Sequence, residues 1–233
     1  MAGKIYLIPV TLGATDYQYV IPEEVLNLTR SLRHFVVEEI RSARRYLRLI
    51  DRTFPINESI FFELNEHTGD EGIGSILEVA EKGSDIGLMS EAGLPGIADP
   101  GSALVKAAHK KDIRVIPLSG PSSIIMALIS SGMNGQRFTF HGYLPVRNDE
   151  RNNKLKEIQK RAQSGETQIF METPYRNQKM FESILSVCQP DTRVCIAADI
   201  TLPEEFIKTK KISEWAKSVP ALNDRLVLFL IGI

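Results

Sequence analysis

The stretch Ser90-Glu91-Ala92-Gly93-Leu94-Pro95-Gly96-Ile97-Ala98-Asp99-Pro100-Gly101 decides the fold of this 233-residue chain. It follows the apolar run Ile86–Met89, which is typical of a buried strand, and precedes the helical pattern of Ser102–His109. A turn from strand to helix is the usual ligand-facing position in an α/β sheet. Its glycines permit close backbone approach and its prolines limit flexibility. We therefore expect a rigid, ligand-facing loop, with Asp99 as the N-cap of the helix.

The rest of the chain alternates apolar runs with helical patterns, which predicts an α/β protein. A helix is expected from Pro22 to His34 and another over Ser75–Glu81, with Gly69–Gly74 as a flexible surface loop before it. The expected strands cover residues 5–10, 35–39, 59–64, 86–89, 113–117, 137–145, 167–172, 193–201, 206–209 and 226–231.

Composition limits the functional classes. Hydrophobic residues make up 43% and charged residues 24%, as in ordinary globular proteins, and the net charge of -1 excludes a global basic field for nucleic acid. The two cysteines, Cys188 and Cys195, lack a zinc spacing and indicate a reducing, cytoplasmic compartment. No apolar run is long enough for a membrane span, and no signal peptide or metal site is expected.

One predicted helix carries a basic face. In residues 40–52, apolar side chains at helical spacing form one face of the helix. The opposite face carries five arginines with no acid between them: Arg41, Arg44, Arg45, Arg48 and Arg52. Such a face is often simply solvated, but guanidinium groups also bind phosphates in bidentate fashion. RNA contacts through Arg41, Arg44, Arg45 and Arg48 are therefore one hypothesis.

The glycine-rich stretch resembles the signature S-[DE]-A-G-x-P-x-I-x-D-P-G of the tetrapyrrole (corrin/porphyrin) methylase superfamily. Four further segments resemble its bacterial small-subunit rRNA ribose 2'-O-methyltransferase I branch: residues 38–41, 117–122, 137–145 and 169–176. The resemblance covers almost the whole chain.

The resemblance implies two α/β domains, residues 1–118 on the presumed substrate side with cofactor loops, and residues 119–233 completing a cofactor cleft between them. It implies S-adenosyl-L-methionine as the cofactor, a homodimer and methyl transfer to a ribose 2'-hydroxyl in small-subunit rRNA. The implied cofactor-binding positions are Leu12, Gly93, Leu94, Ile97, Ser122, Ser123, Met171 and Leu226.

A ribose hydroxyl is a poor nucleophile at neutral pH, so a base or an electrostatic aid is expected. Glu172, Asp199 and His67 are the candidates, because the two acids end predicted strands and His67 falls in a segment resembling the branch's H-[DE]-H-N. The acids Glu38, Glu39, Glu66 and Glu91 also remain open. Any of these acids could instead form a structural ion pair with Arg41 or Arg176.

Departures from the branch's motifs keep two other hypotheses open. Ala14 stands where the branch has Asn, and Ala198 and Leu202 stand where it has Arg and Lys. The second hypothesis is a methyltransferase for another substrate, such as a tetrapyrrole. The third is a catalytically degenerate cofactor-binding or RNA-binding module.

Overall fold

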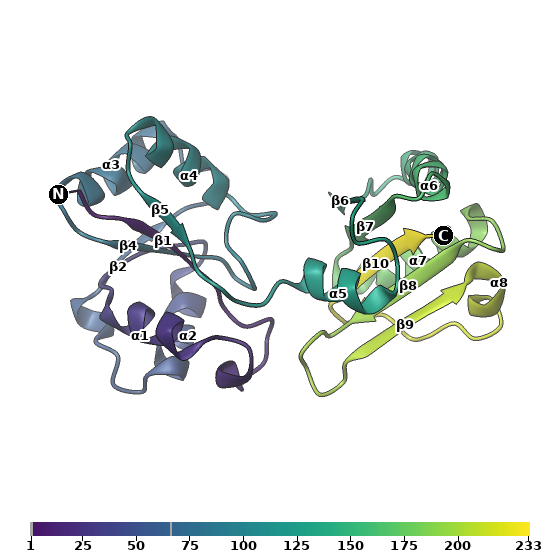
Figure 1. Cartoon of the computed structure of the whole chain (residues 1–233), viewed down its shortest axis with the longest axis horizontal. Helices are drawn as coiled ribbons and strands as arrows, with labels where there is room; N and C mark the ends of the chain where they lie inside the picture. Colours follow the sequence, from purple (N-terminus) through teal and green to yellow (C-terminus); the bar gives the residue numbers. More distant parts are fainter. Residues whose placement is uncertain (1, 66) are drawn as a thin grey trace. The chain divides into compact units, whose positions relative to one another are not determined.

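The computed structural model describes residues 2–65 and 67–233, and its chain forms two compact units that meet between Ser122 and Ser123 (Figure 1). We call the part up to Ser122 unit 1 and the part from Ser123 onward unit 2. The boundary expected from sequence, after residue 118, falls in the same irregular segment, residues 118–122. Each unit has its own sheet and its own apolar core.

Unit 1 is built on a five-stranded, entirely parallel sheet in the order β3-β2-β4-β1-β5. Its strands are β1 (Ile5–Ile8), β2 (His34–Val37), β3 (Ile60–Glu63), β4 (Ile86–Met89) and β5 (Val115–Pro117). The central strands β1, β2 and β4 are nearly continuous apolar runs, because a parallel sheet is covered on both faces.

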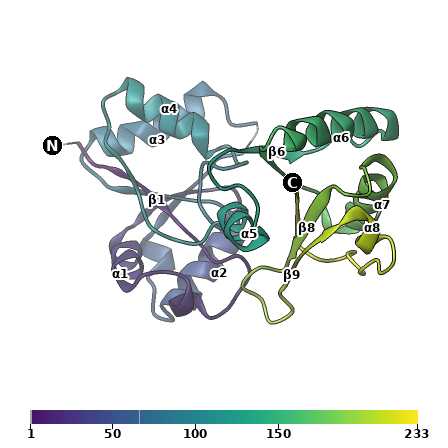
Figure 2. The ribbon, with the colours of Figure 1, turned by 45° about the vertical axis from the view of Figure 1, so that its right-hand side comes forward.

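Helices cover both faces of this sheet (Figure 2). On one face lie α1 (Glu23–Ser31) and α2 (Ile40–Ile50), whose core includes Phe35 and Leu47. On the other lie α3 (Asp70–Glu81) and α4 (Gly101–Lys110), around Val36 and Leu88. Two cores on opposite faces of one parallel sheet define a doubly wound α/β unit, as the alternation of patterns predicts.

Unit 2 has a mixed five-stranded sheet in the order β6-β7-β10-β8-β9, in which only β6 and β7 run parallel. Its strands are β6 (Phe138–Tyr143), β7 (Thr167–Met171), β8 (Arg193–Ala198), β9 (Phe206–Lys211) and β10 (Val227–Gly232). Its helices are α5 (Ser123–Ser131), α6 (Asn148–Gln163), α7 (Asn177–Val187) and α8 (Ile212–Trp215). The core of this unit joins α6, α7 and α8 to the sheet around Phe229 and Trp215.

Short 3-10 helices at Tyr17–Tyr19, Ile56–Glu58 and Pro174–Arg176 complete the regular structure. None of the helices within the described ranges combines the length and apolar character that a membrane span requires.

The structure corrects three local expectations. Residues 70–74 are not a surface loop but the first turns of α3, because Ile73 continues the buried helical spacing of Ile76 and Leu77. The first helix ends at Ser31, since β2 already begins at His34. Pro100, and not Asp99, occupies the N-cap of α4.

Candidate active site

The carboxyl edge of the unit 1 sheet has a topological switch point between β1 and β4. These strands are neighbours, but the chain leaves β1 for β2 on one side and leaves β4 for β5 on the other. The connection after β1 therefore passes over one face of the sheet through α1, and the connection after β4 passes over the other face through α4. In open parallel sheets the carboxyl edge at such a point is the general ligand-binding position.

Three loops contact one another at this edge. The Val10 N–H after β1 donates to the Gly93 carbonyl after β4 at 2.9 Å. A Cβ on Gly93 would lie 3.1 Å from Leu12 Cδ2 and 3.2 Å from the Pro121 carbonyl oxygen, and Gly93 has a φ of +71°. A Cβ on Gly120, after β5, would lie 2.1 Å from Pro9 Cβ. The glycines are thus required by contacts within unit 1.

These contacts change the role that we assign to Gly93. From sequence, Gly93 is expected to leave room for a ligand, but the space beside its Cα is filled by Leu12 and Pro121. A valine at this position would strain the left-handed backbone and push against both neighbours. Gly93→Val is therefore not expected to leave the local fold intact.

Asp99 closes the loop after β4 upon itself. Its carboxylate accepts the Gly96 N–H at 2.8 and 2.9 Å and the Gly101 N–H at 2.8 Å. Asp99 thereby joins the glycine turn to the first turn of α4, although it is not the N-cap. These bonds explain how a stretch with three glycines remains in one conformation.

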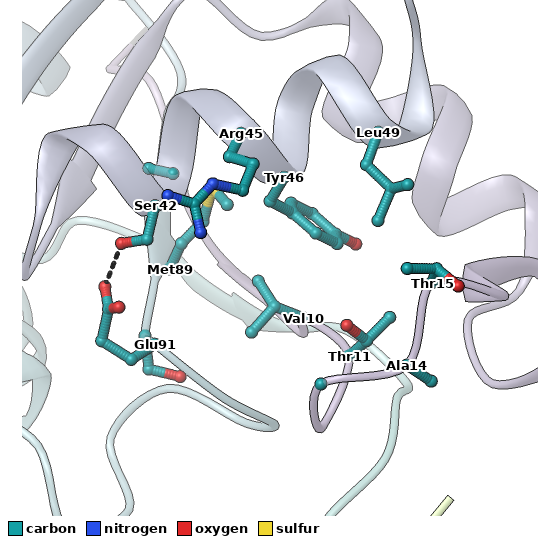
Figure 3. Close-up of a pocket in the computed structure, with 13 residues that line it drawn as sticks. Val10, Thr11, Ala14, Thr15, Ser42, Arg45, Tyr46, Leu49, Met89 and Glu91 are labelled. Atoms are coloured by element: carbon teal, nitrogen blue, oxygen red, sulfur yellow. Dashed lines mark hydrogen bonds between the residues drawn. The ribbon is translucent and has the colours of Figure 1, made fainter. Parts of the chain in front are cut away.

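A cavity of about 300 Å³ lies beside these loops, against α2. Figure 3 shows Ser42 and Glu91 at one end, Leu49 and Thr15 at the other, and Arg45 and Tyr46 between them. The floor includes Val10, Thr11 and Met89. Ser42, Arg45, Tyr46 and Leu49 share a face of α2 because residues three or four apart are neighbours on a helix.

Glu91 is the acid at the polar end of the cavity. Ser42 Oγ donates to Glu91 Oε1 at 2.7 Å. Nearby, burial raises the pKa of the Glu38 carboxyl, and the charges of Asp99 and Glu91 raise it further. Glu39 has a different role: it is the N-cap of α2, and hydrogen bonds from the backbone N–H groups of Arg41 and Ser42 lower its pKa.

The arginines of α2 are all exposed but do not all face the same surroundings. The Arg44 guanidinium lies over the Phe61 ring, 5.1 Å from its centroid, and Arg48 donates to the Arg52 carbonyl at 2.5 Å. Arg45 instead lines the cavity. The arginine face of α2 is therefore solvated along most of its length, and the Arg45 guanidinium contributes a positive charge to the wall of the cavity.

The two unit 2 candidates for catalysis are already bound by arginines. Glu172 Oε1 accepts from Arg176 Nη2 at 2.6 Å and from the Thr173 N–H at 2.7 Å, and its side chain is only 2% exposed. Asp199, with a φ of +51°, accepts from Arg225 Nε at 2.6 Å and from the Leu226 N–H at 2.8 Å. Both carboxylates thus hold the chain at the ends of β7 and β8.

The remaining predicted positions lie in both units. His67 is exposed, in the loop before α3, and Glu66 lies outside the described residues. Five cofactor positions belong to unit 1: Leu12, Gly93, Leu94, Ile97 and Ser122. Three belong to unit 2: Ser123 at the start of α5, Met171 at the end of β7 and Leu226 before β10. Because Met171 pairs with Leu228, Met171 and Leu226 lie at the same end of their sheet.

Sequence reasoning did not single out Tyr46 or Thr15, which line the cavity. In the sequence, Tyr46 resembles an ordinary core residue, and in the structure its hydroxyl donates to the Pro9 carbonyl at 3.3 Å. Its position four residues after Ser42 and next to Arg45 could have indicated that it shares their face of the helix.

Comparison with known proteins places this architecture in a family. The family model for tetrapyrrole (corrin/porphyrin) methylases matches residues 4–216. The ribosomal RNA small subunit methyltransferase I of Haemophilus influenzae is 32% identical over 228 residues, covering 94% of this chain and 79% of the relative. The protein of the same name from Escherichia coli O157:H7 is 30% identical over 218 residues, covering 92% and 72%.

Solved structures show the same fold. The methyltransferase CobJ matches with a TM-score of 0.66 and 17% identity, covering 99% of this chain and 94% of that one. A uroporphyrin-III C-methyltransferase from Thermus thermophilus, complexed with S-adenyl homocysteine, matches with a TM-score of 0.57 and 14% identity, covering 99% and 97%. The extent of these matches and the fold agree, and the chain belongs to the tetrapyrrole (corrin/porphyrin) methylase family of methyltransferases.

Proposed function

We propose that this protein uses S-adenosyl-L-methionine to methylate a ribose 2'-hydroxyl in small-subunit ribosomal RNA. The observation that carries the proposal is the likeness, at 30–32% identity over more than nine-tenths of the chain, to proteins named ribosomal RNA small subunit methyltransferase I. The cavity at the carboxyl edge of the unit 1 sheet supports it, because this edge is where open parallel sheets bind their ligands.

The residues proposed for the cofactor suit its mixed chemistry. Ile97 is 44% and Leu226 56% exposed, which are unusual fractions for large apolar side chains and suit packing against an adenine ring or a methylene chain. Ser122 and Ser123 add hydroxyls where α5 begins. When bound, S-adenosylmethionine supplies an electrophilic methyl group on a sulfonium. The chain's part is to orient the acceptor oxygen toward that group and to hold water away.

The exposed arginines support an RNA acceptor. Arg41, Arg44, Arg45 and Arg48 provide a local basic surface in a protein whose net charge is -1. Each phosphate contact releases about one counterion, so such a surface supplies affinity that does not depend on sequence. We also propose that the protein acts in the cytoplasm, where ribosomal RNA is made in bacteria, and that it is a homodimer.

The proposal is tested by nucleoside mass spectrometry of small-subunit rRNA from a strain that lacks this gene. We expect one 2'-O-methylated nucleoside to disappear and to return when the purified protein and S-adenosylmethionine are added to the mutant's ribosomal subunits. An unchanged nucleoside profile, together with methylation of a tetrapyrrole by the same preparation, would transfer the activity to the small-molecule class.

A further inference from the structure

The cavity beside α2 combines an apolar wall with a charged end. Tyr46, Leu49 and Met89 provide the apolar wall, while Arg45 and Glu91 provide opposite charges near Ser42 (Figure 3). Its volume of about 300 Å³ is at the small end of ligand sites, which span roughly 300–1,000 Å³. A flat ring bearing a sugar and a phosphate matches that size and that division of polarity.

The cavity adjoins the arginine face of α2. Arg41 precedes Arg45 by four residues and Arg48 follows it by three, so the three side chains are neighbours on the helix surface. Arg41 and Arg48 are exposed to solvent, whereas Arg45 also lines the cavity. An RNA strand whose phosphates contact this face therefore passes the mouth of the cavity.

The charge of Arg45 suits an anionic ligand. A guanidinium binds either a phosphate or a carboxylate in bidentate fashion, so Arg45 alone does not separate a nucleotide from S-adenosylmethionine, which carries a carboxylate. The exposed neighbours Arg41 and Arg48 continue the positive surface beyond the cavity. A strand with a phosphate at each nucleotide can use that longer surface, and a single cofactor molecule cannot.

Resting on the function proposed above, we propose that this cavity receives the acceptor nucleotide of the RNA strand. In it, Arg45 binds the nucleotide's phosphate and Glu91 accepts a hydrogen bond from the reacting ribose hydroxyl. The apolar wall formed by Tyr46 and Leu49 packs against the base or sugar.

Glu91 is arranged for this contact. Ser42 holds its Oε1 atom at 2.7 Å, and in the part of the chain that the structure describes Oε2 accepts no hydrogen bond and the carboxylate forms no ion pair. The ribose O–H bond breaks toward this carboxylate while the oxygen forms its bond to the methyl carbon. The carbon–sulfur bond breaks at the same time, and its electron pair stays on the cofactor's sulfur.

The first test separates substrate binding from turnover with mutant-strain small ribosomal subunits as the acceptor. Arg45→Gln should raise the KM for the subunits about tenfold or more at unchanged kcat, because it removes a charge-assisted hydrogen bond. Glu91→Gln retains an acceptor for Ser42 and should lower kcat about a hundredfold at nearly unchanged KM. Lys106→Gln, which changes an exposed residue of α4 on the other face of the sheet, is the matched control and should leave KM and kcat unchanged.

Calorimetry with S-adenosylmethionine on the same variants checks which ligand the cavity holds. Unchanged cofactor affinity in Arg45→Gln and Glu91→Gln supports the assignment. A wild-type KM in Arg45→Gln, a wild-type kcat in Glu91→Gln or a large loss of cofactor affinity in either variant overturns it.

A second measurement does not depend on methylation. A photocrosslinking amino acid is placed at Thr15, an exposed residue lining the cavity, and in a control at Lys106, an exposed residue of α4. Small-subunit rRNA should crosslink from position 15 only, and less so with Arg45→Gln. Absence of a crosslink from position 15 overturns the cavity assignment. A crosslink without any methylation of rRNA instead refutes the proposed function and leaves the RNA-binding cavity standing.

Discussion

The carboxylates at the strand ends of the two units have opposite surroundings. In unit 2, Glu172 and Asp199 are each held by an arginine and by a backbone N–H group. In unit 1, Glu91 is held by a serine hydroxyl, and Glu38 lies near the like charges of Asp99 and Glu91. A carboxylate engaged by a guanidinium stabilises its own loop, whereas one held by a hydroxyl keeps capacity for a ligand.

The largest expected difference between the units is in the free energy of unfolding that is lost when the partner of a carboxylate is removed. Arg176→Ala leaves Glu172 unpaired with a side chain only 2% exposed. Breaking a buried ion pair in this way costs about 3–5 kcal/mol, and we expect the low end because Arg176 itself is 25% exposed. Ser42→Ala in unit 1 should cost about 0.5–1.5 kcal/mol. Urea unfolding of both variants measures the contrast, and equal losses would remove the distinction.

The glycines of the β4 loop sharpen the comparison within unit 1. Gly93 and Gly96 both have positive φ, but only at Gly93 would a Cβ have neighbours within 4 Å. The backbone strain alone costs about 1–2 kcal/mol in either alanine variant. Gly93→Ala should therefore lower the free energy of unfolding more than Gly96→Ala does. If the two variants lose equal stability, contact with Leu12 and Pro121 is not what requires the glycine.

The basic face of unit 1 is tested by the salt dependence of RNA binding. Replacing Arg44 and Arg48 by glutamine should flatten the slope of log K against log salt by roughly 1–2 units and weaken all RNA sequences alike. The control replaces Lys106 and Lys110, which are exposed on α4 across the sheet, and should leave the slope unchanged. Equal slopes for the arginine variant and wild type would identify the face as merely solvated.

The smallest effect concerns Glu38. Its pKa is raised above the usual 4.5 by burial and by neighbouring acids, so the folded state binds the proton more tightly than the unfolded state does. Stability therefore falls as pH rises from about that value through the folded pKa. Glu38→Gln should be slightly more stable than wild type at pH 7, and the difference in stability should narrow as pH falls through the folded pKa toward 4.5. Thermal melts from pH 4 to 8 check the sign; a gap that widens toward acid contradicts it.

Local pattern was enough to predict most elements of the fold. The apolar runs before Ser90 and before Leu118 form β4 and β5, and the two-sided pattern of α2 places Leu47 in the core and Arg44 in solvent. The prediction failed at Gly69–Gly74, where three glycines outweighed the single apolar residue that continues the helix. Ile73 is buried against its own sheet, and tertiary burial overrides helix propensity there.

The candidate site was less predictable, because its contacts join residues far apart in the chain. The pair of Glu172 and Arg176 joins residues four apart and is the ion pair that the sequence offered as an alternative to catalysis. The partner of Asp199, by contrast, is 26 residues away, and nothing local to Asp199 points to it. Likewise, Ser42 and Glu91 form a hydrogen bond although 49 residues separate them in the sequence. The order of the strands in the parallel sheet brings them together, and local sequence patterns do not reveal that order. The assigned cofactor and catalytic residues remain predictions.

The strand order of unit 2 has a consequence for synthesis. All five strands of unit 1 precede residue 118, so its sheet can form while later parts of the chain are still being translated. In unit 2 the central strand is β10, which comes last in sequence among the described strands and lies between β7 and β8. Until β10 leaves the ribosome, the inner edges of β7 and β8 stay open to non-native pairing. The nascent chain thus joins an early-folding unit to one whose sheet stays incomplete until β10 has been made.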